Sequence, residues 1–260
     1  MAVFDDAEVA QIAGTDLLCA HDFNTHCDTC HLRALCLPAA LQDDEIAALE
    51  NIIDQRAVLQ CGEHLYLQDQ PFSSLYAVLS GAMKTYTSEV DGQERVTGCH
   101  LSGEIFGFSA IDKGVYLSSA RALTESRVCE IPFDQLENLC REIPNLQSRL
   151  FRLMSRRIIE DHDLLSQFFD KRPARKRIAA FLLSLSTRAL RRGDSPTRLQ
   201  LPMSRTEVSS YLGVSLEKVC RELSRLEQAG VLSIAGRDIT LHDIASLRGP
   251  QGCAVHDSTY

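Results

Sequence analysis

The sequence predicts an α+β protein in which an antiparallel β-roll or jelly roll is followed by one long helix and a winged helix-turn-helix. Three observations carry this prediction. Short alternating segments fill positions 56–131, an uninterrupted helical pattern starts after Ile143, and two capped helical segments flank Gly213. The expected boundaries are 1–40 for a Cys-rich segment, 41–142 for the β-roll, 143–170 for the long helix, 171–245 for the winged helix-turn-helix and 246–260 for a flexible tail.

Length and composition indicate a globular protein without a membrane span. At 260 residues with 45% hydrophobic content, the chain is long enough to bury a core, and two modest domains are expected. Its apolar runs are shorter than the roughly 20 residues that a membrane-spanning helix needs. The acidic start "MAVFDDAEVA" lacks the basic region of a signal peptide, so we expect a cytoplasmic protein with no membrane partner.

The N-terminal segment "HCDTCHLRALC", residues 26–36, gathers three thiols and two imidazoles. The chain has ten cysteines, which in a reducing compartment favour metal binding, redox chemistry or buried thiols over a disulfide framework. Ligand chemistry alone leaves an iron–sulfur cluster and a zinc site open, the latter with His26 or His31. The spacing fits a structural zinc site badly, and a dithiol redox motif lacks its thioredoxin-like setting.

Residues 41–53 have the pattern of a short helix, and residues 56–131 that of a series of strands. Six segments alternate as strands do: "RAVLQC", "HLYLQ", "SLYAVLS", "AMKTYTS", "ERVTGCHL" and "SRVCEI". Turn residues around Gly62, Gly81, Gly92 and Gly103 separate several of them. Many short strands at close spacing are typical of an antiparallel barrel or jelly roll.

The long helix has two apolar stripes. Pro144 fits its first turn, and neither Gly nor Pro follows until Pro173. One stripe has the alternating three- and four-residue spacing of a coiled-coil seam: Phe151, Met154, Ile158, Asp161, Leu165 and Phe168. A second stripe, which we expect to pack on the β-roll, comprises Leu146, Leu150, Leu153 and Leu164. Two stripes predict a homodimer through the same helix of another subunit, although one helix buried on two sides within a single chain is the alternative.

Asp161 is the charged member of the predicted seam. In a parallel dimer its two copies approach each other, and like charges there weaken association. When monomer and dimer are close in free energy, a sensor domain can shift the equilibrium between them. The alternative is that the Asp161 side chain turns outward and is solvated.

Charge is divided sharply along the chain. Residues 1–170 carry 12 Lys and Arg against 27 Asp and Glu, whereas residues 171–240 carry 14 against 6. An acidic body with a basic module is typical of a nucleic-acid-binding domain joined to another domain. On charge alone, a solvated basic helix face explains the pattern equally well.

The pattern over residues 204–228 favours DNA binding. Ser204 and Glu207 form a capping box, Gly213 allows a tight turn, and Ser215 caps a second helix. Outward residues of that helix are the candidate base readers: Glu217, Lys218, Cys220, Arg221 and Arg225. Arginine suits guanine and glutamate accepts from cytosine, so Glu217 with Arg221 matches a G·C pair in double-stranded DNA. Further candidate contacts are Arg205, Thr206 and, in a β-hairpin wing over residues 231–241, Arg237.

With these elements in this order, the chain resembles the CRP/FNR superfamily of bacterial transcription regulators over roughly residues 26–245. Within it, the chain is most similar to the oxygen-responsive iron–sulfur branch, FNR. The motifs that carry the resemblance are "CDTCHLRALC", "SLYAVLSGAMKTYT", "GCHLSGEIFGF", "ALTESRVCEIPF", "PNLQSRLFRLMSRRI" and "SRTEVSSYLGVSLEKVCREL".

The resemblance implies one 4Fe-4S cluster per subunit, held by Cys27, Cys30, Cys36 and Cys129. Thiolates are the soft ligands that such a cluster requires, and all four positions are filled. The other cysteines are expected to be structural or bystander thiols: Cys19, Cys61, Cys99, Cys140, Cys220 and Cys253.

The resemblance also implies a mechanism and partners. A homodimer along residues 145–169 would bind an inverted repeat of the TTGAT-N4-ATCAA type and activate or repress genes of anaerobic metabolism. Oxygen would convert or destroy the cluster and loosen the dimer. Activation would pass through RNA polymerase, by surface loops that include Glu89–Gln93.

Several positions depart from the family pattern. Cys220 and Lys218 replace a serine and a threonine among the DNA readers, so the outer half-site preference is open. His31 replaces a small polar residue, which leaves the oxygen threshold open. Ser118-Ser119 and Phe108 stand where the cyclic-nucleotide branch has an Arg-Ser pair and a glutamate, so no cyclic nucleotide is expected.

Two competing functions were weighed. One is a regulator of the same fold whose N-terminal cysteines bind zinc or sense thiol oxidation or nitric oxide. The other is an iron–sulfur redox enzyme, which the sequence does not favour because no nucleotide-binding glycine motif or catalytic constellation accompanies the cysteines. We therefore predict that the protein is not an enzyme.

Overall fold

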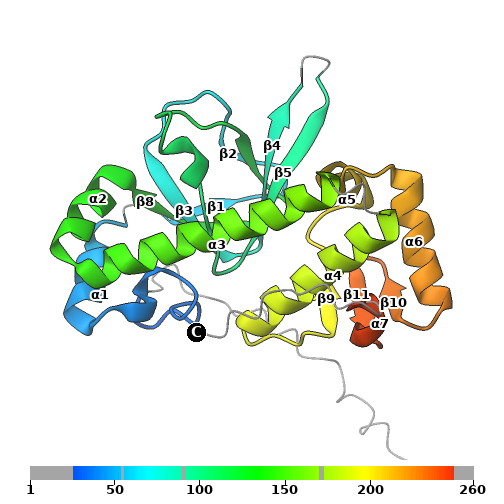
Figure 1. Cartoon of the computed structure of the whole chain (residues 1–260). Helices are drawn as coiled ribbons and strands as arrows, with labels where there is room; N and C mark the ends of the chain where they lie inside the picture. The colour runs from blue at the N-terminus through cyan, green and yellow to red at the C-terminus, as the bar shows by residue number, and fades with distance from the viewer. Residues whose placement is uncertain (1–25, 54–55, 90–91, 170–172, 249–260) are drawn as a thin grey trace, which may run out of the picture.

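The computed structural model describes residues 26–53, 56–89, 92–169 and 173–248. Side chains at 56, 164, 165 and 167–169 lie outside this description. The structure has a β-sandwich with two short helices at one end, one long helix across it, and a smaller helical domain at the other end (Figure 1). None of the described helices is both long enough and apolar enough to span a bilayer.

The β-roll consists of two four-stranded antiparallel sheets, which confirms the predicted fold class. The first sheet has the order β1 (Arg56–Leu59), β8 (Ser126–Pro132), β3 (Ser74–Ser80) and β6 (Ile105–Phe106). The second has the order β2 (His64–Tyr66), β7 (Ser119–Ala122), β4 (Ala82–Ser88) and β5 (Glu94–Leu101). The prediction missed β6 and β7, because two apolar residues are too few to show a period and "SARA" has no strand-forming alternation.

Aromatic rings fill the interior of the β-roll. Tyr66 stacks on Tyr116 with ring centroids 3.8 Å apart, and Tyr76 and Phe106 pack around this pair. All four residues are buried. The space between the sheets is therefore a packed core at this point.

Helices cover the outer face of the first sheet. They are the 3-10 helix η1 (Leu37–Ala40), α1 (Asp43–Asn51), α2 (Phe133–Glu142) and α3 (Pro144–Phe169). The expected short helix is α1, which starts with a capping box of Gln42 and Glu45. The prediction missed α2, whose buried residues Leu136 and Cys140 lie one turn apart and carried the only helical signal.

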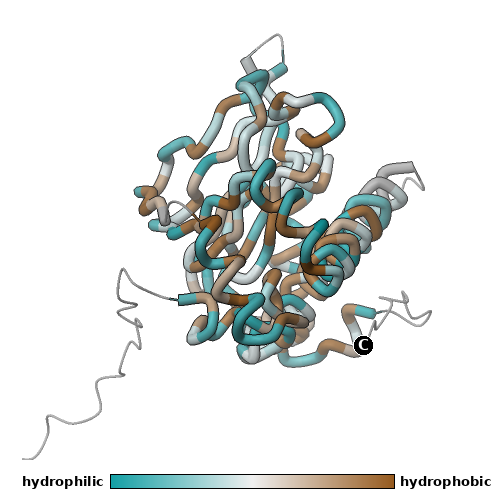
Figure 2. Tube along the Cα trace, turned by 90° about the vertical axis from the view of Figure 1, so that its left-hand side faces the viewer, coloured by the Kyte–Doolittle hydropathy of each residue, from teal (hydrophilic) through white to brown (hydrophobic). Residues whose placement is uncertain are grey.

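The long helix α3 lies at the edge of the molecule, with hydrophobic and hydrophilic residues alternating along it (Figure 2). Its second stripe packs inward as expected: Leu146, Leu150 and Leu153 belong to the core formed with η1, α1 and α2. This packing positions α3 against both the cysteine segment and the β-roll.

The C-terminal domain is a winged helix-turn-helix. Its elements are α4 (Ala174–Arg191), β9 (Arg198–Gln200), α5 (Arg205–Leu212), α6 (Leu216–Gln228), β10 (Leu232–Ala235), β11 (Asp238–Leu241) and α7 (Ile244–Arg248). The expected wing is the β10–β11 hairpin, to which β9 adds a third strand. The helix α7 runs into the stretch expected to be a flexible tail, because Leu247 is buried against the domain core.

Candidate metal centre and nucleic-acid interface

Residues 26–36 form a series of turns anchored by one apolar side chain. Leu32 is buried, and its carbonyl oxygen accepts hydrogen bonds from the backbone N–H groups of Leu35 and Cys36. The N-terminal end of the segment is fixed by a 2.7 Å contact between His26 Nδ1 and Glu50 Oε1 of α1. The loop therefore has a defined path over the edge of the β-roll.

The structure brings the four predicted cluster ligands to one cavity. Cys27, Cys30 and Cys36 line it from the loop, and Cys129 lines it from β8, where it pairs with Ala77 of β3. The four are half-buried. The rest of the lining is almost wholly apolar: Leu32, Leu37, Pro38, Leu49, Ile53, Ala77, Val78, Leu79, Ile131, with Gly103 and Arg33. His26 and His31 are not among these lining residues.

The chemistry of the donor set, four thiols, suits a soft metal centre. Within the described ranges, no three His, Cys, Asp or Glu side chains converge closely enough to hold one metal ion. Burial raises the pKa of Cys36 to about 12; a hydrogen bond from the Leu37 backbone opposes this, and the charges of Cys129, Cys27 and Cys30 add to it. Four soft sulfur donors around an apolar cavity match an iron–sulfur cluster, whose positive irons would displace the thiol protons.

Arg149 ties the cysteine loop to α3. Its Nε donates to the Cys36 carbonyl at 3.0 Å, and its Nη2 donates to the carbonyls of Leu35 at 2.7 Å and Ala34 at 3.2 Å. Sequence analysis missed this role, because a loop carbonyl leaves no pattern in the sequence.

Gly103 allows the loop to approach the β5–β6 turn. Its φ of +86° lies in the left-handed region, and a Cβ built there would stand 2.8 Å from Leu35 Cδ1. The turn and the loop therefore pack in direct contact.

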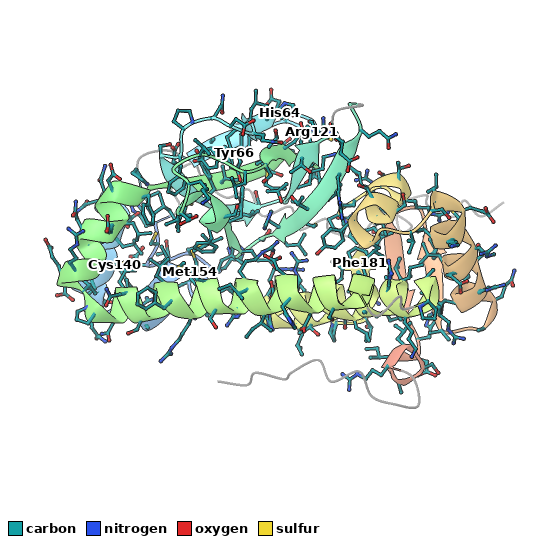
Figure 3. All side chains as sticks on the ribbon, turned by 45° about the horizontal axis from the view of Figure 1, so that its top comes forward. His64, Tyr66, Arg121, Cys140, Met154 and Phe181 are labelled. Carbon is teal, nitrogen blue, oxygen red and sulfur yellow. The ribbon has the colours of Figure 1, made fainter. Side chains whose placement is uncertain are left out.

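The predicted seam of α3 is only partly exposed. Phe151 and Ile158 have 59% and 66% of their surface exposed, whereas Met154 is half-buried and packs on the core that includes Leu150 (Figure 3). The side chains of Leu165 and Phe168 lie outside the described part of the chain. Among the described seam residues, Phe151 and Ile158 are therefore the exposed apolar side chains.

The Asp161 side chain is 49% exposed and is paired within its own helix. Its carboxylate is held within the helix by Arg157, with Nη2 2.8 Å from Oδ1 and Nε 3.2 Å from Oδ2. A one-turn Arg–Asp pair of this kind offsets the charge of Asp161, so the repulsion expected between two copies is reduced.

The helix-turn-helix has the predicted local geometry. The Ser204 Oγ accepts from the Glu207 backbone N–H, and the Glu207 carboxylate accepts from the Ser204 N–H at 2.9 Å. Gly213 ends α5 in the left-handed conformation with φ of 59°, and Ser215 caps α6. Val219 and Leu223 of α6 are buried, so the opposite face of this helix points to solvent.

The candidate DNA contacts lie on the outward face of α6, at the start of α5 and in the β10–β11 turn. All of them are exposed except Cys220, which is half-buried: Glu217, Lys218, Arg221, Arg225, Arg205, Thr206 and Arg237. Arg221 Nη1 lies 3.0 Å from Glu217 Oε1, and Arg205 Nη1 lies 4.0 Å from the sulfur of Cys220. The helix α6 therefore presents a paired acid and base with further cations beside it.

Lys84 joins the helix-turn-helix to the β-roll. Its side chain is 3% exposed, and its Nζ lies 2.8 Å from Glu207 Oε1 and 2.9 Å from Glu94 Oε2. Beside it, Ser210 Oγ accepts from the Val96 N–H at 3.0 Å. The first helix of the DNA-binding motif thus rests on the β4–β5 hairpin, which sequence analysis did not predict.

Comparison with known proteins agrees with both halves of this description. Residues 56–143 match the cyclic nucleotide-binding domain family, and residues 176–249 match the Crp-like helix-turn-helix domain family.

Two curated relatives cover most of the chain. The fumarate and nitrate reduction regulatory protein of Escherichia coli strain K12 is 40% identical over 227 residues, which are 86% of this chain and 90% of that protein. The protein of the same name from Salmonella typhimurium is 39% identical, with 87% of this chain and 90% of that protein covered. Among solved structures, FixK2 from Bradyrhizobium japonicum matches 75% of this chain and 95% of that one, with a TM-score of 0.67 and 27% identity.

Proposed function

Because the chain belongs to the CRP/FNR superfamily of transcription regulators, in the branch of the fumarate and nitrate reduction regulatory proteins, we propose that it senses oxygen through a 4Fe-4S cluster. As a regulator of this family it is not an enzyme. Cys27, Cys30, Cys36 and Cys129 hold one cluster per subunit, and oxygen controls DNA binding. The single observation that carries this proposal is the apolar cavity that these four cysteines line together.

The cluster supplies an oxygen-labile centre, and the residues of the chain transmit its state. Three of the ligands lie on a loop whose last carbonyl groups are bound by Arg149 of α3. A change of ligand geometry at Cys36 therefore acts directly on the helix that carries the exposed seam.

DNA binding is assigned to α6 and its neighbours. Arg221 and Glu217 read a G·C pair, while Arg205 and Arg237 lie where they can contact phosphates. In a homodimer formed along Phe151 and Ile158, two copies of α6 read an inverted repeat of the TTGAT-N4-ATCAA type. RNA polymerase is the further partner, contacted through the β4–β5 hairpin around Glu89–Gln93.

A cyclic nucleotide is not the effector in this proposal. Phe108 and Ser119 stand at the positions that the cyclic-nucleotide branch uses, and Ser119 Oγ is already bound by the Gln68 N–H at 2.9 Å. The stacked rings of Tyr66 and Tyr116 fill the neighbouring interior of the roll.

Metal analysis of anaerobically purified protein tests the cluster. We expect about four irons and four acid-labile sulfides per subunit, and loss of the visible spectrum in air. Cys129→Ser should abolish iron retention, while Cys61→Ser, an exposed thiol outside the cavity, should leave it unchanged. One zinc per subunit that is indifferent to air, or full iron content in Cys129→Ser, would overturn the proposal in favour of the zinc or thiol alternative.

Gel retardation tests the DNA assignment separately. Arg221→Ala should remove discrimination between an inverted-repeat duplex and a scrambled duplex, which corresponds to about 1–3 kcal/mol per base contact. Arg141→Ala is the matched control, because Arg141 is also an exposed arginine in a one-turn pair, with Glu137 on α2. Equal retention of both duplexes by the parent protein would contradict the assignment.

A further inference from the structure

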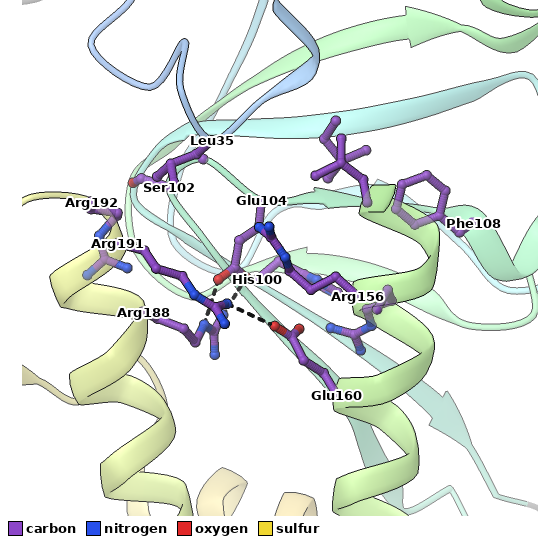
Figure 4. A pocket seen from close by; sticks show the side chains of 14 residues that line it. Leu35, His100, Ser102, Glu104, Phe108, Arg156, Glu160, Arg188, Arg191 and Arg192 are labelled. Carbon is purple, nitrogen blue, oxygen red and sulfur yellow. Dashed lines mark hydrogen bonds and ion pairs between the residues drawn. The ribbon is translucent and has the colours of Figure 1, made fainter. Parts of the chain in front are cut away.

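A second cavity lies where the β5–β6 turn, α3 and the end of α4 meet (Figure 4). It is separate from the four cysteines and shares only Gly103 with their cavity. Five arginines line it: Arg156 and Arg157 from α3, and Arg188, Arg191 and Arg192 from α4 and its C-cap. Two carboxylates, Glu104 and Glu160, accompany them.

The two carboxylates are already committed to two of the arginines. Arg188 binds both carboxylate oxygens of Glu104 and donates to the Cys99 carbonyl at 2.8 Å. Arg191 Nη1 lies 3.3 Å from Glu160 Oε1. These pairs fix α4 against the β-roll and α3, and they leave no lining carboxylate for the other three arginines.

The remaining arginines have donor capacity to spare. Arg156 has no ion pair with any acidic residue among those described, and Arg157 is bound by Asp161 beside the cavity. Arg192 Nε binds Asp194 at 2.8 Å, but its Nη1 is buried and has no acceptor within the described structure. The cavity therefore carries surplus positive charge and an unused guanidinium donor.

His100 supplies a second unused donor. It is 3% exposed, and its Nε2 lies 3.3 Å from Thr85 Oγ1, which itself accepts from the Thr97 hydroxyl at 3.1 Å. In the tautomer whose Nε2 accepts from the Thr85 hydroxyl, the ring proton lies on Nδ1. This Nδ1 is buried without a partner among the described residues. Burial, and then the charges of Arg157 and Arg188, hold the pKa of His100 well below its usual range, so the ring is neutral.

We propose that this cavity binds a small phosphate-bearing anion, held by Arg156, Arg192 and His100. A phosphate offers several oxygen acceptors, and guanidinium groups match its geometry in two-pronged contacts. A buried N–H without an acceptor is unfavourable, so an anion that accepts from His100 and Arg192 relieves two such groups at once. Because Arg156 lies on α3 and Arg192 ends α4, the bound anion bridges the long helix and the DNA-binding domain.

The test is thermal unfolding of the full chain with increasing inorganic phosphate, at ionic strength held constant with chloride. A ligand that binds only the folded state raises the Tm in a saturable way. We expect this rise in the parent protein. Arg156→Gln should raise the half-saturating phosphate concentration by about tenfold, which corresponds to one lost charged contact.

The half-saturating phosphate concentration of Arg156→Lys should lie between those of the parent and Arg156→Gln, because lysine keeps the positive charge but cannot make a two-pronged contact. The control Arg152→Gln removes an exposed arginine of the same helix that does not line the cavity, and it should behave as the parent. A nucleoside monophosphate titrated in the same way distinguishes free phosphate from a larger ligand, which would bind more tightly. A parent Tm that follows ionic strength alone, or equal responses of Arg156→Gln and Arg152→Gln, would overturn the proposal.

Discussion

Arg149→Met isolates the link between the cysteine loop and the long helix. Methionine keeps the unbranched stem of the side chain and the helix propensity but removes the guanidinium N–H groups, which donate three hydrogen bonds here. In the parent, these donors bind the carbonyls of Ala34, Leu35 and Cys36 at 2.7–3.2 Å. The Cys36 carbonyl also accepts from Ala39 at 3.4 Å, so two of the three acceptors depend mainly on Arg149.

The expected change in the free energy of unfolding is the balance of two opposing contributions. Hydrogen bonds from a charged donor contribute about 1.5–3 kcal/mol each, but Ala34 is exposed and its carbonyl can be hydrated after the substitution. Burial and the charges of Arg156 and Arg152 lower the pKa of Arg149, which shows that its charge is held at an unfavourable position. Allowing for both effects, we expect Arg149→Met to reduce the free energy of unfolding by about 2 kcal/mol, or roughly 30-fold in the equilibrium constant.

Urea unfolding of metal-free protein under reducing conditions measures this change without reference to any cofactor. Arg152→Met is the control, since Arg152 is exposed on the same helix and makes no contact with the loop. Hydrogen exchange should also show faster exchange in residues 32–36 of Arg149→Met alone. An unfolding free energy equal to that of the parent, or an equal loss in Arg152→Met, would refute the role given to the three carbonyl contacts.

Three further predictions concern the packing of the turn, the hairpin contact and the seam. Gly103→Ala should lower the free energy of unfolding by about 1–3 kcal/mol in a urea titration, because of its positive φ and the approach of Leu35; unchanged stability would contradict that geometry. Burial raises the pKa of Glu207, but hydrogen bonds from Lys84 and Ser204 outweigh this and hold it below 4.5. The resulting stabilisation is complete above pH 4.5 and is lost as the pH falls through the lower folded-state pKa, so Glu207→Gln should flatten the acid limb of stability against pH. Ile158→Glu should increase the dissociation constant in sedimentation analysis under conditions where the parent dimerises, and an unchanged value would place the dimer elsewhere.

Periodic and local signals allowed most of the fold to be predicted. The capping box at Ser204 and the turn at Gly213 are dictated by residues within one turn of each other, and the structure has both. The same holds for the buried stripe of α3, because side chains three and four residues apart share a helix face. The strand β7 was missed because its short sequence has no alternation and its pairing with β2 and β4 depends on distant parts of the chain. The helix α2 was missed although its apolar residues share one helix face.

The candidate site was likewise predicted only in part. The four cysteines were named from the family resemblance, and the fold brings Cys129 to the same cavity as the other three. Lys84 and Arg149 could not be predicted, because their partners are distant in the sequence and include backbone carbonyls. The pairing of Asp161 with Arg157 was available from their four-residue spacing, but the seam interpretation considered Asp161 only against another copy of itself.

The buried ammonium of Lys84 has a geometric consequence for any assembled pair of subunits. Lys84 and Ser210 hold α5 against the β4–β5 hairpin. Because α6 packs on α5, the orientation of α6 depends on this contact with the sandwich. In the proposed dimer, the distance between the two recognition helices would then depend on the β4–β5 hairpin. Shortening or twisting that hairpin would shift the phase at which the two recognition helices meet the turns of the duplex.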